Sequence, residues 1–384
     1  MLDKNFPVRL VQPLFDSGLI DLILELEHLR RKEINGTTHR LVFEQLKTLF
    51  HIMESVGSAR IEGNNTTVAE YIDAKIEQPN NSAPNFKEIS NIEKAMCFIE
   101  NNVKDYDINR MFVSELHKKV VEDLPLPPEG EGDANPGAYR TRNVKITGSS
   151  HEPIDCLAIS SCMDELFSFI NKQDESKYDL LKAAIAHHRF VYIHPFANGN
   201  GRTARLFTYA MLVKLGFNVD VGRILNPTAV FCSNRNNYYE YLAKADSGDD
   251  DGILEWCEYM LSGLKAEIEK IDRLLDYEYL KDTILLPAIK FSLERQYITD
   301  TEFKVLKVVI NKQVVQNKDF QDLFQGKKPA HISREIRHLI DKKILQQEQE
   351  GTRKYVIRFD NNYLMRSVIK LLGDNDFLPE NERL

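Results

Sequence analysis

Apolar residues recur at helical spacing along most of the first 120 residues, so that they would line one face of successive α-helices. The pattern predicts helical structure over residues 15–62, 66–78, 87–104 and 108–122. A breaker run at 78–84, rich in proline and asparagine, separates the second of these segments from the third. The N-terminal third of the chain is therefore expected to be a set of packed helices.

The pattern changes after residue 122. A loop rich in proline and glycine covers 124–137, and Val144 and Ile146 then alternate with polar neighbours. Because such alternation is typical of a strand with one buried face, we expect a β-hairpin over 138–148. Helical spacing then returns, and further helices are expected at 154–171, 178–193, 201–215, 235–245 and 252–275.

The C-terminal part carries shorter elements. Residues 276–298 are predicted to be a helical connector, followed by helices at 299–312, 316–324 and 327–345 and a hairpin over 346–359 that turns at Glu350-Gly351. Three helices followed by a hairpin is the order of a winged helix-turn-helix domain. The fold class predicted for the whole chain is mainly α, with a hairpin in the first part and a winged helix at the end.

Composition agrees with a soluble globular protein, since 42% of the 384 residues are apolar and 28% are charged. No run of about 18 apolar residues is present, so we expect no membrane span, and we expect no signal peptide at the N-terminus. The five cysteines form no C-x-x-C pair, which argues against a zinc site or a disulfide framework and favours the cytoplasm.

Charge is distributed unevenly. The chain carries a net charge of −8, which argues against a protein that coats nucleic acid along its whole surface. Residues 327–354 nevertheless hold eight lysines and arginines against four acidic residues. A basic helix and wing would suit the major groove and backbone of DNA, but a winged helix can equally mediate protein contacts or dimerisation. Both interpretations stay open.

The segment HHRFVYIHPFANGNGRTARLF, residues 187–207, carries the most specific chemistry. Pro195 should end one helix, and the turn Asn198-Gly199-Asn200-Gly201 should expose backbone N–H groups at the start of the next, which makes an anion site. Arg202 and Arg205 are three positions apart and can reach the same anion. His194 precedes the turn as a candidate base, and the Asn198 amide oxygen suits Mg²⁺.

HPFANGNGR followed by Arg205 resembles the signature of the Fic family, His-x-Phe-x-(Asp/Glu/Asn)-Gly-Asn-Gly-Arg-x-x-Arg. The wider resemblance extends over roughly residues 50–260 and implies a helical fold with a hairpin flap. It also implies binding of ATP and Mg²⁺ and transfer of AMP to a hydroxyl group of a target protein, on Ser, Thr or Tyr, with release of pyrophosphate. Modification of the chain itself and a homodimer are further possibilities.

The resemblance assigns roles to individual residues. His194 would be the general base, Phe196 a core anchor and Asn198 the ligand of Mg²⁺. The remaining assignments are the phosphate and nucleotide contacts Gly199, Asn200, Gly201, Arg202, Thr203, Ala204 and Arg205, the adenine-pocket residue Tyr238, and the flap residues Val144, Lys145, Ile146, Thr147, Gly148 and Ser149, which would pair with the target by strand addition.

A second short motif lies upstream. Glu62 is predicted to lie in the last turn of a helix, where the helix dipole disfavours a carboxylate by about 0.3–1 kcal/mol. Ser58-x-x-x-Glu62-Gly63 resembles the inhibitory helix motif of Fic proteins, in which the glutamate pairs with the second arginine of the signature, here Arg205. A bidentate pair of this kind would compete with the γ-phosphate of ATP, so the resemblance implies an autoinhibited enzyme.

Two other functions are retained as alternatives: a DNA-binding regulator whose Fic domain senses nucleotide, and a Fic enzyme with another phosphate-containing donor. The presence of both Gly201 and Arg205 favours AMP transfer over the second alternative. The expected domains are an N-terminal helical region (1–104) with the inhibitory helix at about 44–63, a Fic catalytic core (105–275), a helical connector (276–298) and a winged-helix domain (299–384).

Overall fold

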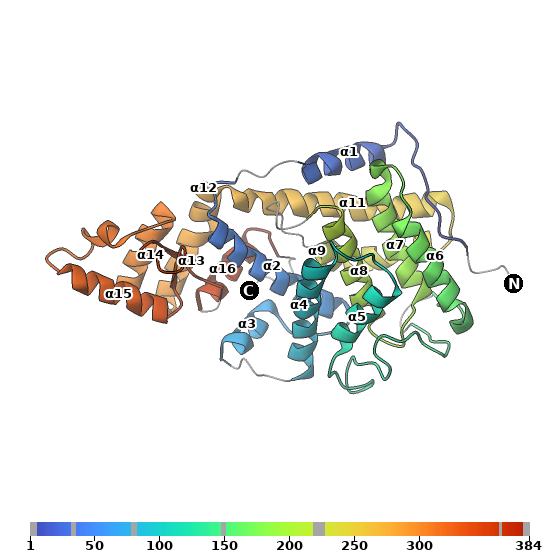
Figure 1. Ribbon diagram of the computed structural model, residues 1–384, viewed down its shortest axis with the longest axis horizontal. Coiled ribbons are helices and arrows are strands. Elements are labelled where there is room, and N and C mark those ends of the chain that lie inside the picture. Colours follow the sequence, from blue (N-terminus) through green and yellow to red (C-terminus); the bar gives the residue numbers. More distant parts are fainter. Residues whose placement is uncertain are drawn as a thin grey trace. The chain divides into compact units, whose positions relative to one another are not determined.

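A computed structural model describes residues 6–31, 36–77, 83–146, 151–217, 227–360 and 363–378. The chain divides into two compact units, which are described separately (Figure 1). The first comprises Met1–Glu33, Glu54–Thr66 and Ser82–Ile268, and the second comprises Ile34–Met53, Thr67–Asn81 and Glu269–Leu384. None of the helices in the described ranges is long and apolar enough to cross a bilayer.

The regular structure in the described residues of the first unit is helical, without strands, and loops connect the helices. Its helices are α1 (Gly18–Arg31), the C-terminal part of α2 (Arg40–Ile61), α4 (Pro84–Asn102), α5 (Arg110–Val121), α6 (Ile159–Asn171), α7 (Asp179–Ile193), α8 (Asn200–Lys214), α9 (Pro227–Ser233), α10 (Arg235–Ala245) and most of α11 (Asp250–Asp272). In Figure 1, α7 and α8 lie side by side, and α4 and α5 pack on α8 while α6 packs on α7.

Helices α7 and α8 form the centre of this unit. Nearly all of their side chains are buried, including the charged residues Lys182, Arg189, Arg202 and Arg205. Charged side chains are seldom fully buried unless they are paired, so this burial requires partners and marks these two helices as candidates for function. Trp256 of α11 packs against the same core: its Nε1 donates to the Ala184 carbonyl at 2.7 Å.

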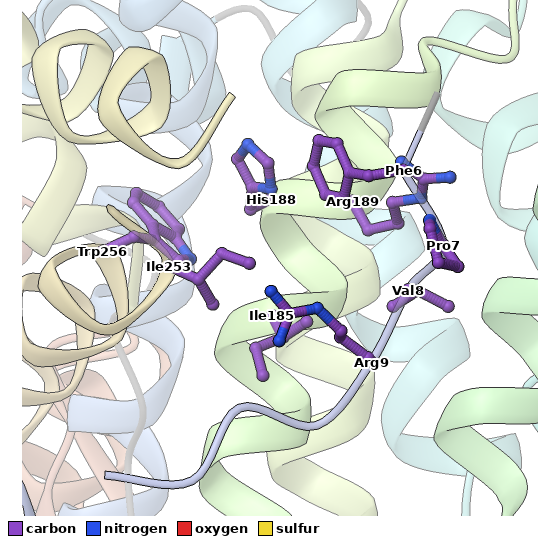
Figure 2. Close-up of a pocket in the computed structure, with 9 residues that line it drawn as sticks. All are labelled: Phe6, Pro7, Val8, Arg9, Ile185, His188, Arg189, Ile253 and Trp256. Carbon is purple, nitrogen blue, oxygen red and sulfur yellow. The ribbon is translucent and has the colours of Figure 1, made fainter. Parts of the chain in front are cut away.

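The N-terminal segment lies against α7, as Figure 2 shows. The ring of Phe6 stacks on His188 with centroids 6.4 Å apart, and the Arg189 guanidinium lies 5.0 Å from the centre of the Phe6 ring. The Val8 N–H donates to Oε1 of Glu165 at 3.1 Å, which fastens the segment to α6 as well. The segment therefore covers a small cavity between α7 and α11.

The second unit combines further helices with a small sheet. It contains α3 (Val68–Glu77), α12 (Tyr277–Tyr279), a π-helical turn (Leu280–Leu285), α13 (Leu286–Glu294), α14 (Asp300–Lys312), a 3₁₀ turn (Asn317–Phe320), α15 (Pro329–Asp341), the strands β1 (Leu345–Gln347) and β2 (Tyr355–Ile357), and α16 (Tyr363–Asp374). The strands are antiparallel, with Leu345 opposite Ile357 and Gln347 opposite Tyr355. Gly351, with φ of 79°, lies in the turn between them.

The mainly helical class is confirmed, and so is the C-terminal hairpin. The predicted continuous helical pattern over 15–62 is two helices, α1 and α2, and the predicted helix over 316–324 is only the 3₁₀ turn with following turns. Helices α9 and α16 were not predicted, although both present buried apolar faces.

The hairpin predicted over 138–148 is wrong for residues 138–146, which form no strand, and residues 147 and 148 lie outside the described ranges. Val144 and Ile146 are half-buried and Lys145 is exposed, so the alternation does report burial. The backbone of this segment, however, is held by hydrogen bonds from one side chain and not by hydrogen bonds between paired strands. Arg140 donates from Nη2 to the Ile154 carbonyl at 2.6 Å and from Nη1 to the Arg142 carbonyl at 3.0 Å.

We predict that Trp256→Ala lowers the free energy of unfolding of the first unit by about 3–5 kcal/mol, because it removes a fully buried indole and its hydrogen bond. Urea denaturation followed by circular dichroism measures this. Met111→Ala, at a side chain that is 79% exposed, is the control and should change stability by no more than about 0.5 kcal/mol. Equal stability of the two variants would contradict the assignment of Trp256 to the core.

Candidate active site

The turn between α7 and α8 has the local geometry that its sequence predicts. His194 ends α7 in the left-handed region, with φ of 53°, and Gly199 precedes α8 with φ of 72°. Asn200 closes the turn: its Oδ1 accepts from the Phe196 N–H and its Nδ2 donates to the Phe196 carbonyl, both at 2.9 Å. These two bonds hold the turn together, and the first N–H groups of α8 have no partners within the helix.

Arg140 fixes the end of α7 from outside the turn. Its Nε donates to the His194 carbonyl at 2.8 Å, and its backbone N–H donates to the Pro195 carbonyl at 2.9 Å. The carbonyls at a helix C-terminus lack intrahelical partners, and Arg140 satisfies them with a positive charge that also suits the helix dipole. Arg140 was not identified from the sequence.

His117 of α5 supports the other side of the turn. Its ring stacks on Phe196 with centroids 3.7 Å apart, its Nε2 donates to the Asn198 carbonyl at 3.0 Å, and its Nδ1 accepts from the Gly137 N–H at 2.8 Å. These bonds require the neutral ring, and burial lowers the pKa of His117 to about 4. Phe196 is fully buried, as expected of a core anchor.

Asn198 lies among acidic groups at the edge of the turn. Its Nδ2 donates to Oε2 of Glu131 and to the Gly132 carbonyl, both at 3.2 Å, and its backbone N–H donates to Oδ2 of Asp133 at 3.1 Å. Its Oδ1 accepts from the Gly199 N–H at 2.8 Å. An amide oxygen has two lone pairs, so one remains for a further partner.

Arg202 points into a buried acidic environment. Its Nη1 lies 2.9 Å from Oε1 of Glu88, and its Nη2 donates to the backbone carbonyl of Glu131 at 2.9 Å and to Oε2 of the same residue at 3.3 Å. Glu88 comes from α4 and Glu131 from the loop after α5, so three separate segments meet at this guanidinium. Neither glutamate was identified from the sequence.

Arg205 contacts the end of α2. Its Nε donates to Oγ of Ser58 at 2.8 Å, and its Nη2 donates to the Ser58 carbonyl at 2.9 Å and to Oε1 of Glu62 at 2.7 Å. Ser58 and Glu62 therefore lie on one face, as their spacing predicts. The contact differs from the expected bidentate pair. One carboxylate oxygen of Glu62 accepts from Nη2 of Arg205, and the Ser58 hydroxyl accepts from Nε.

Glu62 also lies directly over the first turn of α8. A methyl group placed on Gly201 would come within 2.1 Å of Oε1 of Glu62 and within 3.2 Å of Nη1 of Arg205. No side chain larger than hydrogen fits at position 201 while Glu62 keeps this position. The carboxylate thus occupies the space against the N-terminus of α8, where an anion would otherwise bind.

The charges in the site shift the titration of its members. Although burial opposes the shift, the positive charges of Arg205 and Arg202 lower the pKa of Glu62, so it is ionised at neutral pH. Burial, and after it the charge of Arg140, lowers the pKa of His194 to about 4, with Glu62 acting in the opposite direction. His194 is therefore neutral at pH 7 and able to accept a proton.

Several buried polar atoms around the turn lack a hydrogen-bond partner among the described residues. They are Nδ1 of His194, Nε and Nη1 of Arg202, and Nη1 of Arg205. Buried donors without partners are uncommon in native proteins and costly when isolated. Three nitrogens of two guanidinium groups without a directed hydrogen bond to any described residue, beside a helix N-terminus, indicate a site built for an anion.

Other predicted site residues have different surroundings. Tyr238 is buried, and its hydroxyl lies 3.0 Å from Nε2 of His187, whose Nδ1 lies 2.7 Å from Oγ1 of Thr208. Thr203 donates from Oγ1 to the Gly199 carbonyl at 2.7 Å, and Ala204 is fully buried. Of the predicted flap, Val144–Ile146 have no regular secondary structure, and Thr147, Gly148 and Ser149 lie outside the described residues.

Comparison with known proteins identifies the domain. The sequence model of the Fic/DOC family matches residues 107–212, which include the turn from His194 to Arg205. A protein adenylyltransferase Fic of Nematostella vectensis is 30% identical over 199 residues, covering 50% of this chain and 42% of the relative. A protein of the same name from Drosophila yakuba is 31% identical over 222 residues, covering 56% of this chain and 40% of the relative.

Solved structures agree on the fold. A Fic family protein from Desulfovibrio desulfuricans aligns with 91% of this chain and 98% of its own, at a TM-score of 0.55 and 18% identity. Fic-1 of C. elegans aligns with 66% of this chain and 71% of its own, at a TM-score of 0.51 and 23% identity. Residues 107–212 are therefore similar to the Fic/DOC family, and the mainly helical fold of the chain is the fold of these solved Fic structures. The matched region spans about two fifths of the curated relatives.

We predict that His117 makes the protein less stable in acid. Its folded pKa of about 4 lies below the unfolded value of 6.5, so the unfolded state binds more protons between these values and stability falls as pH drops through that window. Over the whole window, His117 should account for on the order of 3 kcal/mol of lost stability.

Urea denaturation of the wild type and of His117→Gln at intervals from pH 7 to pH 4 measures the effect. The dependence of the unfolding free energy on pH should be shallower in His117→Gln, whatever the change in stability at pH 7. Met111→Gln, at a side chain that is 79% exposed and does not titrate, is the control and should leave the dependence unchanged. Parallel curves for His117→Gln and the wild type would show that His117 does not titrate with folding.

Proposed function

We propose that this chain is a protein adenylyltransferase that transfers AMP from ATP to a hydroxyl group of a target protein. The observation that carries the proposal is the set of buried, unsatisfied guanidinium nitrogens of Arg202 and Arg205 beside the N-terminus of α8 and the neutral His194. The relatives named protein adenylyltransferase Fic share the Fic domain, which supports this reaction over other uses of the same anion site.

The chemistry follows from the arrangement. The imidazole of His194 takes the proton of a Ser, Thr or Tyr hydroxyl as its oxygen attacks the α-phosphorus of ATP. The bond between the α-phosphorus and the bridging oxygen breaks, and pyrophosphate leaves with that oxygen. Arg202, Arg205 and the N–H groups that begin α8 stabilise the negative charge of the β- and γ-phosphates, which grows on the leaving group.

Magnesium fits the site as a companion of ATP. Within the described residues, no group of three or more histidines, cysteines or carboxylates is placed to hold a metal ion. Asn198 has a free lone pair on its amide oxygen, and Mg²⁺ commonly takes few protein ligands and completes its shell with phosphate oxygens and water. Asn198 would therefore hold Mg²⁺, which when bound neutralises phosphate charge.

We further propose that the enzyme is autoinhibited by the end of α2. A γ-phosphate would compete with Glu62 for the guanidinium of Arg205, whose Nη2 lies 2.7 Å from the carboxylate, and for the space over Gly201 that the carboxylate fills. Because the Arg205 side chain is buried, its bond to the carboxylate is stronger than a surface ion pair. The activity would therefore appear when the end of α2 moves away.

We expect this protein to act in the cytoplasm on a target protein that presents an exposed Ser, Thr or Tyr. Modification of the chain itself and a homodimer are further proposals. We place the inhibitory helix in the region 1–104 and the catalytic core in 105–275. Val144 to Ser149 would guide an extended target segment, and Tyr238 would border the adenine.

A second function is proposed for the C-terminal elements, which would form a winged helix-turn-helix. On α15, Ile332, Ile336 and Leu339 are buried while Arg334 and Arg337 are exposed. Two arginines three positions apart on the exposed face of a helix suit a DNA backbone or major groove. The same face could instead bind an acidic protein. If α15 binds DNA, the chain would be a DNA-binding regulator whose Fic domain senses nucleotide.

We predict that Glu62→Gly raises self-labelling from radioactive ATP by at least about tenfold, because it frees Nη2 of Arg205 for phosphate. Denaturing gels followed by autoradiography measure the label, and intact-mass spectrometry identifies an added AMP. Adding His194→Ala to Glu62→Gly should abolish the label. Glu115→Gln, at an exposed carboxylate of α5, is the control. Equal labelling of Glu62→Gly and the wild type would contradict autoinhibition.

We also predict that the full chain retards a random DNA duplex in a gel at low salt. Arg334→Ala combined with Arg337→Ala should reduce the slope of log affinity against log salt by about 2, because two phosphate contacts are lost. Lys290→Ala, at an exposed lysine of α13, should leave the slope unchanged. Failure of the wild-type chain to bind DNA at low salt would favour a protein partner for α15.

A further inference from the structure

Glu88 is a buried carboxylate that the proposed reaction does not use directly. It lies in the first turns of α4, and its Oε1 is 2.9 Å from Nη1 of Arg202. The side chain of Glu88 is 6% exposed and that of Arg202 is 1% exposed, so neither charge is screened by water. An uncompensated charge at this depth would be strongly destabilising, and each group therefore depends on the other.

The position of Glu88 is fixed from its other side. Its Oε2 accepts from Nδ2 of Asn64 at 2.8 Å, and the same nitrogen donates to the Asn85 carbonyl at 2.9 Å. Oδ1 of Asn64 accepts from the Thr66 N–H at 3.0 Å. With both carboxylate oxygens engaged and the side chain buried, Glu88 cannot turn away from Arg202 without breaking the bond to Asn64.

The remaining contacts of Arg202 leave a defined set of donors for a ligand. Nη2 is held by the backbone carbonyl and the carboxylate of Glu131, at 2.9 and 3.3 Å. Nη1 faces Glu88 in an ion pair without a directed hydrogen bond, and Nε is unsatisfied among the described residues. Glu131 and Glu88 thus fix the orientation of the guanidinium, while the N–H groups of Nε and Nη1 can still donate hydrogen bonds to a ligand.

We infer that Glu88 is a positioning residue for Arg202: it holds the guanidinium in the orientation that receives the β- and γ-phosphates of ATP, and Asn64 holds Glu88. The inference rests on the proposed function, because it takes the ligand of Arg202 to be a nucleotide polyphosphate. Loss of the carboxylate lets the buried guanidinium turn toward Glu131, away from the phosphates. Removal of the Glu88 carboxylate should therefore weaken the binding of ATP, which has β- and γ-phosphates, more than the binding of AMP, which has neither.

Titration calorimetry of the full chain tests the inference. Glu62→Gly serves as the parent, so that ATP does not compete with the inhibitory carboxylate, and it is titrated with ATP and Mg²⁺ and separately with AMP. Glu88→Gln keeps the size of the side chain and an acceptor for Asn64 but removes the charge. In the parent background it should weaken ATP binding about tenfold, as expected when one charge-assisted contact of about 1.4 kcal/mol is lost.

Binding of AMP, which lacks the β- and γ-phosphates, should change less than about twofold, a difference of under 0.4 kcal/mol. Glu115→Gln makes the same chemical change at an exposed carboxylate that pairs with Lys118, and it should leave both affinities unchanged. Asn64→Ala removes the bond that holds Glu88, together with the bonds to Asn85 and Thr66, and leaves the Glu88 carboxylate in place. It should produce a smaller loss of the same kind, about threefold for ATP and none for AMP.

The outcomes are distinct. Equal weakening of ATP and AMP would show a general structural defect and overturn the inference, as would unchanged or tighter ATP binding in Glu88→Gln. If Glu88→Gln does not fold, as judged by thermal melting, Asn64→Ala decides by the same comparison. A parent that binds no ATP would overturn the proposed function together with this inference, whereas a parent that binds ATP without transferring AMP would overturn only the transfer.

Discussion

The guanidinium of Arg205 is buried at the centre of a helical unit, and a buried guanidinium is strongly destabilising unless an anion or hydrogen-bond acceptors pair with it. In this structure the partners are Ser58 and Glu62, from a helix about 140 residues earlier in the chain. During the proposed reaction the partner would be a phosphate. The exchange of one anion for another at a site that cannot remain empty of both is the physical basis of the proposed control.

The same constraint extends to Arg202. Glu62, Glu88 and Glu131 surround two guanidiniums, so the site without nucleotide contains more negative than positive side chains. Glu62 is the carboxylate that lies over the first turn of α8, while Glu88 is anchored through Asn64. In this account Glu62 moves away when nucleotide binds and Glu88 keeps its position. Asn64, which holds Glu88, lies only two residues after Glu62 in the chain.

The turn could be predicted from a local pattern, because Pro195 and two glycines define it. The pairing of Glu62 with Arg205 was expected from the resemblance to the Fic inhibitory motif, and the interval from Ser58 to Glu62 only placed the two residues on one helix face. Glu88 and His117 could not be predicted, since each acts through a contact with a distant segment and neither lies in a recognisable pattern. The hairpin at 138–148 failed for a related reason. Burial alternates there, but a long-range clamp by Arg140 replaces the ladder that alternation usually indicates.

The most direct measurement is a pair of crystal structures, of the wild type and of Glu62→Gly, each grown with a non-hydrolysable ATP analogue and Mg²⁺. The account predicts that in Glu62→Gly the γ-phosphate lies within about 3 Å of the Arg205 guanidinium and over Gly201, as expected for a charge-assisted hydrogen bond. In the wild type, Glu62 should keep that place and exclude the γ-phosphate. A γ-phosphate on Arg205 in the presence of an undisplaced Glu62, or a nucleotide bound away from the His194–Arg205 turn in both crystals, would contradict it.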